Sequence, residues 1–317
     1  TSAQLMILAD GIRHMKISLR TAVFLTKSIA SRRKPLKKAS VKKKKSIIPG
    51  FGLTMGITVA MLSLIILIPL ASVLAYSFKL SFKEFGELIT SPNVVQAFAT
   101  SIFCAFVAAI INCIFGVILA WVLVRYEFPG KRLMDGMIEL PFALPTAVAG
   151  ITLTKMYSNT GFLGRALENI GIKAAYSKLG IIIAMVFIGI PFVVRAIQPV
   201  LEKLSPSYEE AALMLGASGF TTFRKVIFPE IKPALLTGFG LALARGIGEY
   251  GSVIYISGNS AKNGTQVVSY IIMQKLNAGN VDYEGAAAIA LILLVVSFLM
   301  LFIINIIQHI ASSRTNS

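Results

Sequence analysis

Arg245 and Glu249 are the residues whose types and spacing point most directly to chemistry, because both lie in an otherwise apolar stretch. A charge at the centre of a membrane helix costs about 2.5–3.5 kcal/mol on insertion scales, and such residues are functional candidates. Four residues apart, the two side chains share one face of a helix. Two interpretations stay open. They form an ion pair buried between helices, or Arg245 faces a pathway and offers positive charge to an anion while Glu249 orients it or serves as a gate partner.

A second polar position, Thr146, follows two prolines, Pro141 and Pro145, in another apolar stretch. Proline inside a helix frees backbone carbonyls and bends the chain. Membranes tolerate such breaks where the backbone is buried or lines a cavity. This segment therefore contains ordinary packing kinks, or it helps to line a path across the membrane.

The sequence contains no recognisable arrangement for catalysis, metal binding or nucleotide binding. His14 and His309 are isolated at opposite ends, so we expect no metal site. Gly130-Lys131 lacks the spaced glycine and the following Ser or Thr of a phosphate-binding loop. We therefore expect no cofactor in this chain and no ATP hydrolysis by it, and a membrane-embedded enzyme is disfavoured.

The composition indicates which elements must position these residues. Of the 317 residues, 56% are hydrophobic and only 14% are charged, and the mean hydropathy is +0.76. Soluble domains contain about 25% charged residues, so we predict an all-α, polytopic membrane protein. Six stretches have the roughly 20 apolar residues that a spanning helix needs. They are 53–78, 97–124, 137–157, 180–200, 234–257 and 285–311.

The positive charge is concentrated before the first predicted span. Residues 1–50 hold 13 of the 31 Lys and Arg residues but a single acid, Asp10. We expect a basic, disordered tail over 1–46 that stays in the cytoplasm or its equivalent and contacts anionic lipid. Its composition also resembles an organellar transit peptide. Without aromatic interleaving or a binding motif, nucleic acid is not an expected partner.

The polar stretch between the fourth and fifth predicted spans is patterned as two short helices at the inner membrane surface. Ser205, directly before a proline, is a typical helix start, but Ser207 with Glu210 three residues later could instead form a capping box. Gly216 could end this helix as a left-handed residue. Thr221 or Thr222 could then cap a second short helix, which Pro229 would stop.

This loop, residues 201–233, resembles the EAA motif of binding-protein-dependent ABC importer permeases. The match consists of Glu210, Ala211, Ala212, Gly216 and Pro229 at the family's spacing, with Val226 and Phe228 where the family has Ile and Leu. The resemblance implies a type I importer permease fold with six transmembrane helices. It also implies that the loop is a coupling helix, which docks in a groove of a separate ATPase subunit that binds the ATP.

Two further runs, residues 243–253 and 140–151, resemble the sulfate and molybdate permeases of this family, with Gly246 in place of the usual Ala. The resemblance covers about 52–312, which we take as the permease domain, and it is nearer to the sulfate/thiosulfate branch. It implies a second homologous permease subunit, two ATPase subunits and a soluble sulfate-binding protein as partners. Transport would proceed by alternating access, with Arg245, Glu249 and Thr146 along the substrate pathway.

Several alternatives remain open from the sequence. Molybdate or tungstate could replace sulfate, because all are tetrahedral dianions. An ion-coupled secondary transporter built on Arg245 and Glu249 would predict inverted internal repeats, and we find none. The similarity extends to permeases encoded in algal and liverwort plastids. We therefore expect the plastid (chloroplast) inner envelope membrane, with a bacterial plasma membrane as the alternative.

Overall fold

The computed structural model describes residues 51–313, and every regular element in this range is helical. The elements are α2 (Phe51–Leu62), η1 (Ser63–Leu67), α3 (Ile68–Ser77), α4 (Phe82–Ile89), α5 (Pro92–Arg125), α6 (Lys131–Ala143), α7 (Thr146–Tyr157), α8 (Phe162–Glu168), α9 (Lys178–Lys203), α10 (Ser207–Met214), α11 (Gly219–Thr222), η2 (Phe223–Ile227), α12 (Phe228–Ile247), α13 (Val253–Ile256), α14 (Val268–Leu276) and α15 (Tyr283–Ser313). The π-helical turns are η1 and η2. The basic tail expected over 1–46 lies outside the described residues.

The chain divides into two compact units, with the boundary between Met61 and Leu62. The described part of the first unit is 51–61, all of α2 except its last residue, and no residue of this apolar helix is buried. All the other helices belong to the second unit, and the candidate site lies within it.

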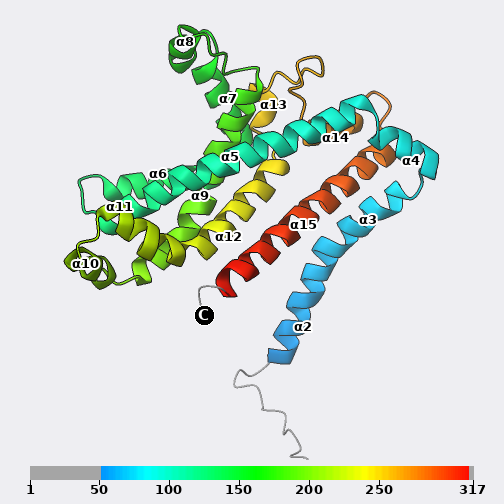
Figure 1. Ribbon diagram of the computed structural model, residues 1–317. Helices are drawn as coiled ribbons and strands as arrows, with labels where there is room; N and C mark the ends of the chain where they lie inside the picture. Colours follow the sequence, from blue (N-terminus) through cyan, green and yellow to red (C-terminus); the bar gives the residue numbers. More distant parts are fainter. Residues whose placement is uncertain (1–50, 314–317) are drawn as a thin grey trace, which may run out of the picture. The chain divides into compact units, whose positions relative to one another are not determined.

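The core of the second unit is built by α5, α9 and α12, which pack against one another (Figure 1). Small residues allow these helices to approach closely. A Cβ atom on Gly116 of α5 would lie 2.6 Å from the Val193 side chain of α9. One on Gly238 of α12 would lie 2.8 Å from the Val193 backbone. Such contacts are typical of membrane helices, whose association depends on close packing.

The third predicted span, 137–157, is not one straight helix. It consists of α6 and α7, which meet at an angle of 113°. Pro145 causes the break, because proline disfavours the helical conformation of the residue before it, and Leu144 is extended with ψ 137°. At 1.5 Å per residue, the 12 residues of α7 span roughly 18 Å. This is too short to cross a hydrocarbon core of about 30 Å alone.

The prediction that Pro229 stops a helix is wrong, because the chain stays helical from Gly219 to Ile247. The turn η2 precedes the proline, and the N–H of Phe228 donates to the carbonyl of Phe223, five residues earlier. This wider turn accommodates Pro229 in the first turn of α12, where its missing N–H is tolerated. The helix also begins earlier than predicted, because Ser218 caps it rather than Thr221 or Thr222.

The fifth predicted span, 234–257, ends too late. Helix α12 stops at Ile247, and four irregular residues and Ser252 separate it from the short helix α13. Glycines at positions 246, 248 and 251 weaken the helix here. This break places Glu249 beyond the end of the helix that carries Arg245.

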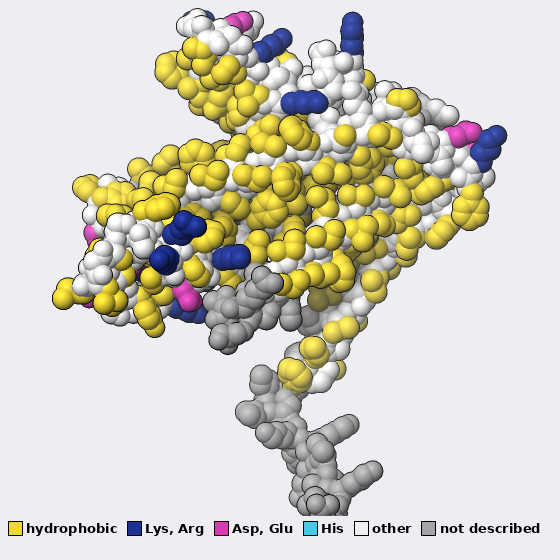
Figure 2. Space-filling view, in the orientation of Figure 1, with side chains coloured by type: hydrophobic (Ala, Val, Ile, Leu, Met, Phe, Trp, Pro, Cys, Tyr) yellow, Lys and Arg dark blue, Asp and Glu magenta, His cyan; other side chains and the backbone are white. Residues whose placement is uncertain are grey.

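Five helical segments of the described residues are long and apolar enough to cross a membrane, or six if the bent pair α6 and α7 counts as one span. The five are Phe51–Ser77, Pro92–Arg125, Lys178–Lys203, Gly219–Ile247 and Tyr283–Gln308. Figure 2 shows hydrophobic side chains over most of the visible face, with charged side chains towards its edges. Exposed hydrophobic side chains of the described residues include Phe103 and Phe106 of α5 and Phe298 and Phe302 of α15. This distribution suits lipid contact.

The orientation inferred from the charge distribution leads to a labelling prediction. A cysteine at Asn159, after α7, should react with an impermeant maleimide only from outside, and one at Ser218, before α11, only after the inner face is opened. The native Cys104 is buried and Cys113 is half-buried within α5, so the unmodified chain is the control and should react weakly. Labelling of both new cysteines from one side would overturn the orientation.

Candidate functional site

Helix α10 carries the residues of the predicted EAA motif, with Glu210, Ala211 and Ala212 on consecutive positions. The helix begins at Ser207, close to the start expected from Ser205, and the alternative capping box of Ser207 with Glu210 is wrong, because no such side-chain bond forms. The Ser205 hydroxyl accepts a hydrogen bond of 3.3 Å from the N–H of Ser207, the first residue of α10. This bond satisfies one of the free donors at the helix N-terminus.

Gly216 ends α10 in the left-handed conformation, as expected, with φ +80°. The N–H of Gly216 donates to the Leu213 carbonyl at 2.9 Å, and the N–H of Ala217 donates to the Ala212 carbonyl at 3.0 Å. These two bonds form a complete Schellman motif. The chain therefore turns sharply after one short helix, and α11 begins three residues later.

Apolar side chains at the end of α10 are exposed to solvent. Leu213 is 56% exposed, and Met214 and Leu215 are each 88% exposed. Glu210 is exposed on the same helix, and among the described residues its carboxylate has no hydrogen-bond or ion-pair partner. Exposed apolar side chains around an unpaired charge are typical of a protein interaction site.

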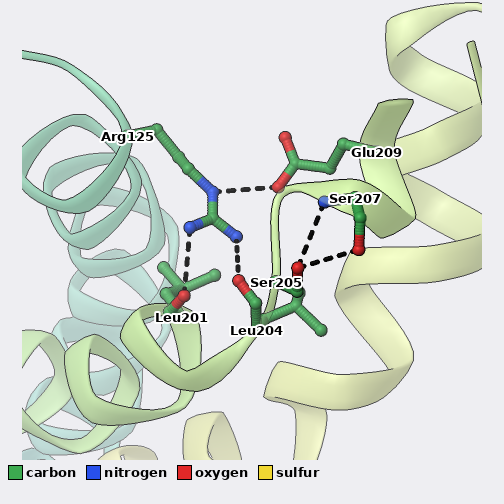
Figure 3. A network of polar contacts seen from close by, with 6 residues as sticks. All are labelled: Arg125, Leu201, Leu204, Ser205, Ser207 and Glu209. Atoms are coloured by element: carbon green, nitrogen blue, oxygen red, sulfur yellow. Dashed lines mark hydrogen bonds and ion pairs between the residues drawn. The ribbon is translucent and has the colours of Figure 1, made fainter. Parts of the chain in front are cut away.

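The opposite face of α10 is attached to the helix bundle through Arg125, the last residue of α5 (Figure 3). Its Nε donates to Oε1 of Glu209 at 2.9 Å, and its two terminal nitrogens donate to the backbone carbonyls of Leu201 and Leu204 at 3.1 and 3.0 Å. The guanidinium also lies 5.6 Å from the ring centroid of Trp121. Arg125 thus joins α5, the end of α9 and α10.

The sequence argument did not identify Arg125 or Glu209 as site residues. Arg125 lies at the end of an apolar stretch, outside the motif, and Glu209 directly precedes the motif. The two residues are 84 positions apart, so local spacing does not reveal their contact. One signal could have suggested this contact. Arg125 lies in the last turn of a long apolar helix, and the patterned loop contains an acidic residue, Glu209, that could pair with it.

Arg245 and Glu249 form the predicted ion pair, with 2.5 Å between Nη1 and Oε2. Glu249 is 1% exposed, whereas the side chain of Arg245 is 35% exposed. The carboxylate also accepts bonds from the N–H and the hydroxyl of Ser252, at 2.8 and 2.9 Å. The Glu249 carboxylate is therefore bonded by both Arg245 and Ser252, and Arg245 is the solvent-accessible member of the ion pair.

The structure brings Thr146 to the chain segment that follows Glu249. A Cβ atom on Gly251 would overlap the Thr146 hydroxyl. One turn further along α7, a Cβ on Gly150 would lie 2.5 Å from the carbonyl oxygen of Ser252. The first turns of α7 thus pack directly on the break between α12 and α13, so all three predicted pathway residues border one region.

A third charged group joins α6 to α9, and the sequence argument did not single it out. Arg195 of α9 pairs with Asp135 and Glu139 of α6, at 2.8 and 2.7 Å. This cluster ties α6, the first helix of the bent pair, to α9. Within residues 51–313, no three His, Cys, Asp or Glu side chains come together as metal ligands would.

Comparison with known proteins supports a transport role for this arrangement. Residues 112–316 match the family model described as the binding-protein-dependent transport system inner membrane component. The sulfate transport system permease protein CysT of Salmonella typhimurium is 47% identical over 83% of this chain and 94% of its own length. A probable sulfate transport system permease protein of Nephroselmis olivacea is 44% identical, covering 78% of this chain and 86% of its own.

Among solved structures, similar folds occur in bacterial ABC transporters. A chain of a transporter for the import of the acidic polysaccharide alginate aligns with a TM-score of 0.68 and 16% identity, covering 82% of this chain and 96% of its own. A chain of the MetNI methionine ABC transporter in an inward-facing conformation aligns with a TM-score of 0.51 and 14% identity, covering 68% of this chain and 95% of its own. At these identities the similarity concerns the fold alone.

Proposed function

Because this chain belongs to the family of binding-protein-dependent transport system inner membrane components, we propose that it is the permease subunit of an ATP-driven importer for sulfate or thiosulfate. The observation that carries this proposal is α10, which presents Glu210 and an apolar surface away from the helix bundle. The anion is taken from the sulfate transport permeases that this chain resembles at up to 47% identity.

In this proposal α10 is the coupling helix, with Glu210, Ala211, Ala212 and Gly216 at its contact with an ATPase subunit. Leu213, Met214 and Leu215 would be buried on docking, which supplies the hydrophobic part of the interface. Pro229 lies in the first turn of α12, inside the helical segment that runs from Gly219 to Ile247. ATP would be bound and hydrolysed by the partner, so this chain needs no cofactor of its own.

The proposed substrate pathway passes Arg245, Glu249 and Thr146, beside a second homologous permease subunit. Among the described residues Arg245 has one protein partner, Glu249, which occupies one of its terminal nitrogens. Its remaining donors, on a side chain that is 35% exposed, could bind the oxygens of a tetrahedral dianion. Alternating access would move this region from one side of the membrane to the other.

The chain is an integral, multi-pass membrane protein. We place it in the plastid inner envelope, with the bacterial plasma membrane as the alternative, because its relatives include both plastid-encoded algal and bacterial permeases. In either membrane a soluble sulfate-binding protein would deliver the anion to the outer side.

Uptake of labelled sulfate tests the proposed function. The chain would be expressed in bacteria that lack the equivalent permease and retain the partner subunits, with molybdate as the competitor. Sulfate uptake that modest molybdate does not suppress is the expected result. Suppression by molybdate would reassign the anion, and absent uptake by a membrane-inserted chain that co-purifies with the ATPase would contradict the proposal.

Replacing Glu210 with lysine should reduce this uptake to the background of the strain without the chain, because a reversed charge would face the ATPase groove. Gly216→Trp should have a similar effect, since a side chain at φ +80° disfavours the turn that ends α10. Glu202→Lys, at an exposed position near the end of α9, is the matched control and should transport normally. Wild-type uptake by the Glu210 variant, at equal membrane level, would contradict the coupling role.

A further inference from the structure

Helix α10 is held to the helix bundle by very few contacts. None of its eight residues is buried, and only Glu209 and Ala212 are half-buried. Within the described part of the chain, the bond between Glu209 and Arg125 is the side-chain hydrogen bond or ion pair that links α10 to a different helix. The position of α10 therefore depends strongly on Arg125.

Arg125 reaches more than one element at the same time. The carbonyls of Leu201 and Leu204 belong to the last turn of α9, where carbonyl groups have no helical partner and the helix dipole is negative. A guanidinium can satisfy two such carbonyls and a carboxylate together, because its donors form a planar fork. A lysine ammonium is a point charge and cannot reproduce this geometry.

The environment makes these bonds stronger than those of a surface ion pair. The Arg125 side chain is 13% exposed and that of Glu209 is 22% exposed. By contrast, Lys131 and Glu127 form an ion pair at the same end of α5, but the Glu127 side chain is 89% exposed. Exposed pairs of this kind contribute little because water screens them.

We propose that Arg125 is a positioning residue that locks α10 to the inner ends of α5 and α9. Any displacement of α10 is then passed to both long helices together, instead of being absorbed by the turns at Ser205 and Gly216. This inference rests on the proposed function, because it assigns to Arg125 the transmission of the movement that the ATPase imposes on α10.

The test uses the complete importer, with both permeases and the ATPase subunits, in liposomes supplied with the loaded binding protein. The quantity measured is the number of sulfate ions imported per ATP hydrolysed. Arg125→Gln should lower this ratio about tenfold while ATP hydrolysis continues, because a loss of charge-assisted bonds of this kind is worth about a factor of ten or more. Arg125→Lys should import only slightly more sulfate per ATP than Arg125→Gln does. Lys131→Gln, the matched control, should keep the wild-type ratio.

Swapping the charges of Arg125 and Glu209 distinguishes the proposed role of Arg125, which binds three acceptors, from that of a simple ion pair. Combining Arg125→Glu with Glu209→Arg restores opposite charges, but the new carboxylate would face the carbonyl oxygens of Leu201 and Leu204. We therefore expect the double variant to import as little sulfate per ATP as Arg125→Gln does. Recovery to the wild-type ratio would show that charge pairing alone suffices and would overturn the lock.

A purely structural role has a different signature. In that case Arg125→Gln would lower the yield of assembled importer, yet the complexes that form would import sulfate at the wild-type ratio, and this result would overturn the proposal. Failure of the proposed function is distinguishable, because the wild-type complex would then import no sulfate at all.

Discussion

A Glu249→Leu variant is expected to lose most of its folded, membrane-inserted population. The substitution removes the partner of Arg245 and, at the same time, the acceptor of both Ser252 donors. Removing one partner of a buried pair typically costs about 3–5 kcal/mol, which is a large part of the stability of most proteins. The fraction that elutes as a monodisperse species after detergent extraction measures the effect.

The double variant Arg245→Leu, Glu249→Leu is the matched comparison. It removes both charges, so it should be recovered better than either single variant. Recovery should still fall below the wild type, because the buried Ser252 N–H remains without its acceptor. Equal recovery of the two single variants and the double variant would show that the two charges do not depend on each other.

Replacing Gly150 with valine should have the second large effect. Even the first carbon of the new side chain would lie 2.5 Å from the carbonyl oxygen and 2.6 Å from the Cα of Ser252. These are backbone atoms that cannot rotate aside, so α7 must separate from the start of α13. We expect destabilisation of about 3 kcal/mol, at the upper end for overpacking, and loss of sulfate uptake.

Gly136→Ala provides the control for this prediction, because it also replaces a glycine within a helix of the same bent pair. A Cβ at Gly136 meets no atom within 4 Å. Alanine should therefore leave the melting temperature unchanged or raise it, since glycine inside a helix costs about 0.5–1 kcal/mol relative to alanine. Equal melting temperatures for Gly150→Val and Gly136→Ala would contradict the close packing of α7 on α13.

Features set by neighbouring residues could be predicted from the sequence. The end of α10 at Gly216 follows from one glycine and two backbone bonds to residues within five positions. Pairing of Arg245 with Glu249 follows from their spacing of four. Hydropathy located the five long apolar helices and the region of the bent pair α6 and α7, because the length of a spanning helix depends on the thickness of the bilayer. It did not locate the bend, and it placed the end of the fifth span too late.

Helix breaks were predicted less well, because proline has several structural solutions. Pro145 separates α6 from α7, whereas Pro229 lies inside a continuous helical segment. The difference arises from the π-turn η2, which widens the backbone ahead of Pro229. Nothing in the local residue types distinguishes these two outcomes. After the break at Ile247, the Glu249 carboxylate accepts a bond from the N–H of Ser252, the residue directly before α13, and the local residue types do not reveal this bond.

Arg125 could not be assigned because its role depends on tertiary structure. Its three acceptors come from the end of α9 and the start of α10, about 80 residues away. Only the packing of α5 against α9 brings them within reach. The chemistry of Arg is visible in the sequence, but the carbonyls that it binds are defined by where another helix ends.

The exposed apolar residues beside α10 have a consequence for how much of this protein a cell can hold. Met214 and Leu215 are each 88% exposed, and under the proposed function an ATPase subunit would cover them. An orphan copy displays them continuously, and such patches attract chaperones and proteases. Under the proposed function, the supply of ATPase subunits would set the abundance of this subunit. Chains without an ATPase partner would be degraded, which would keep the two subunits in a constant ratio.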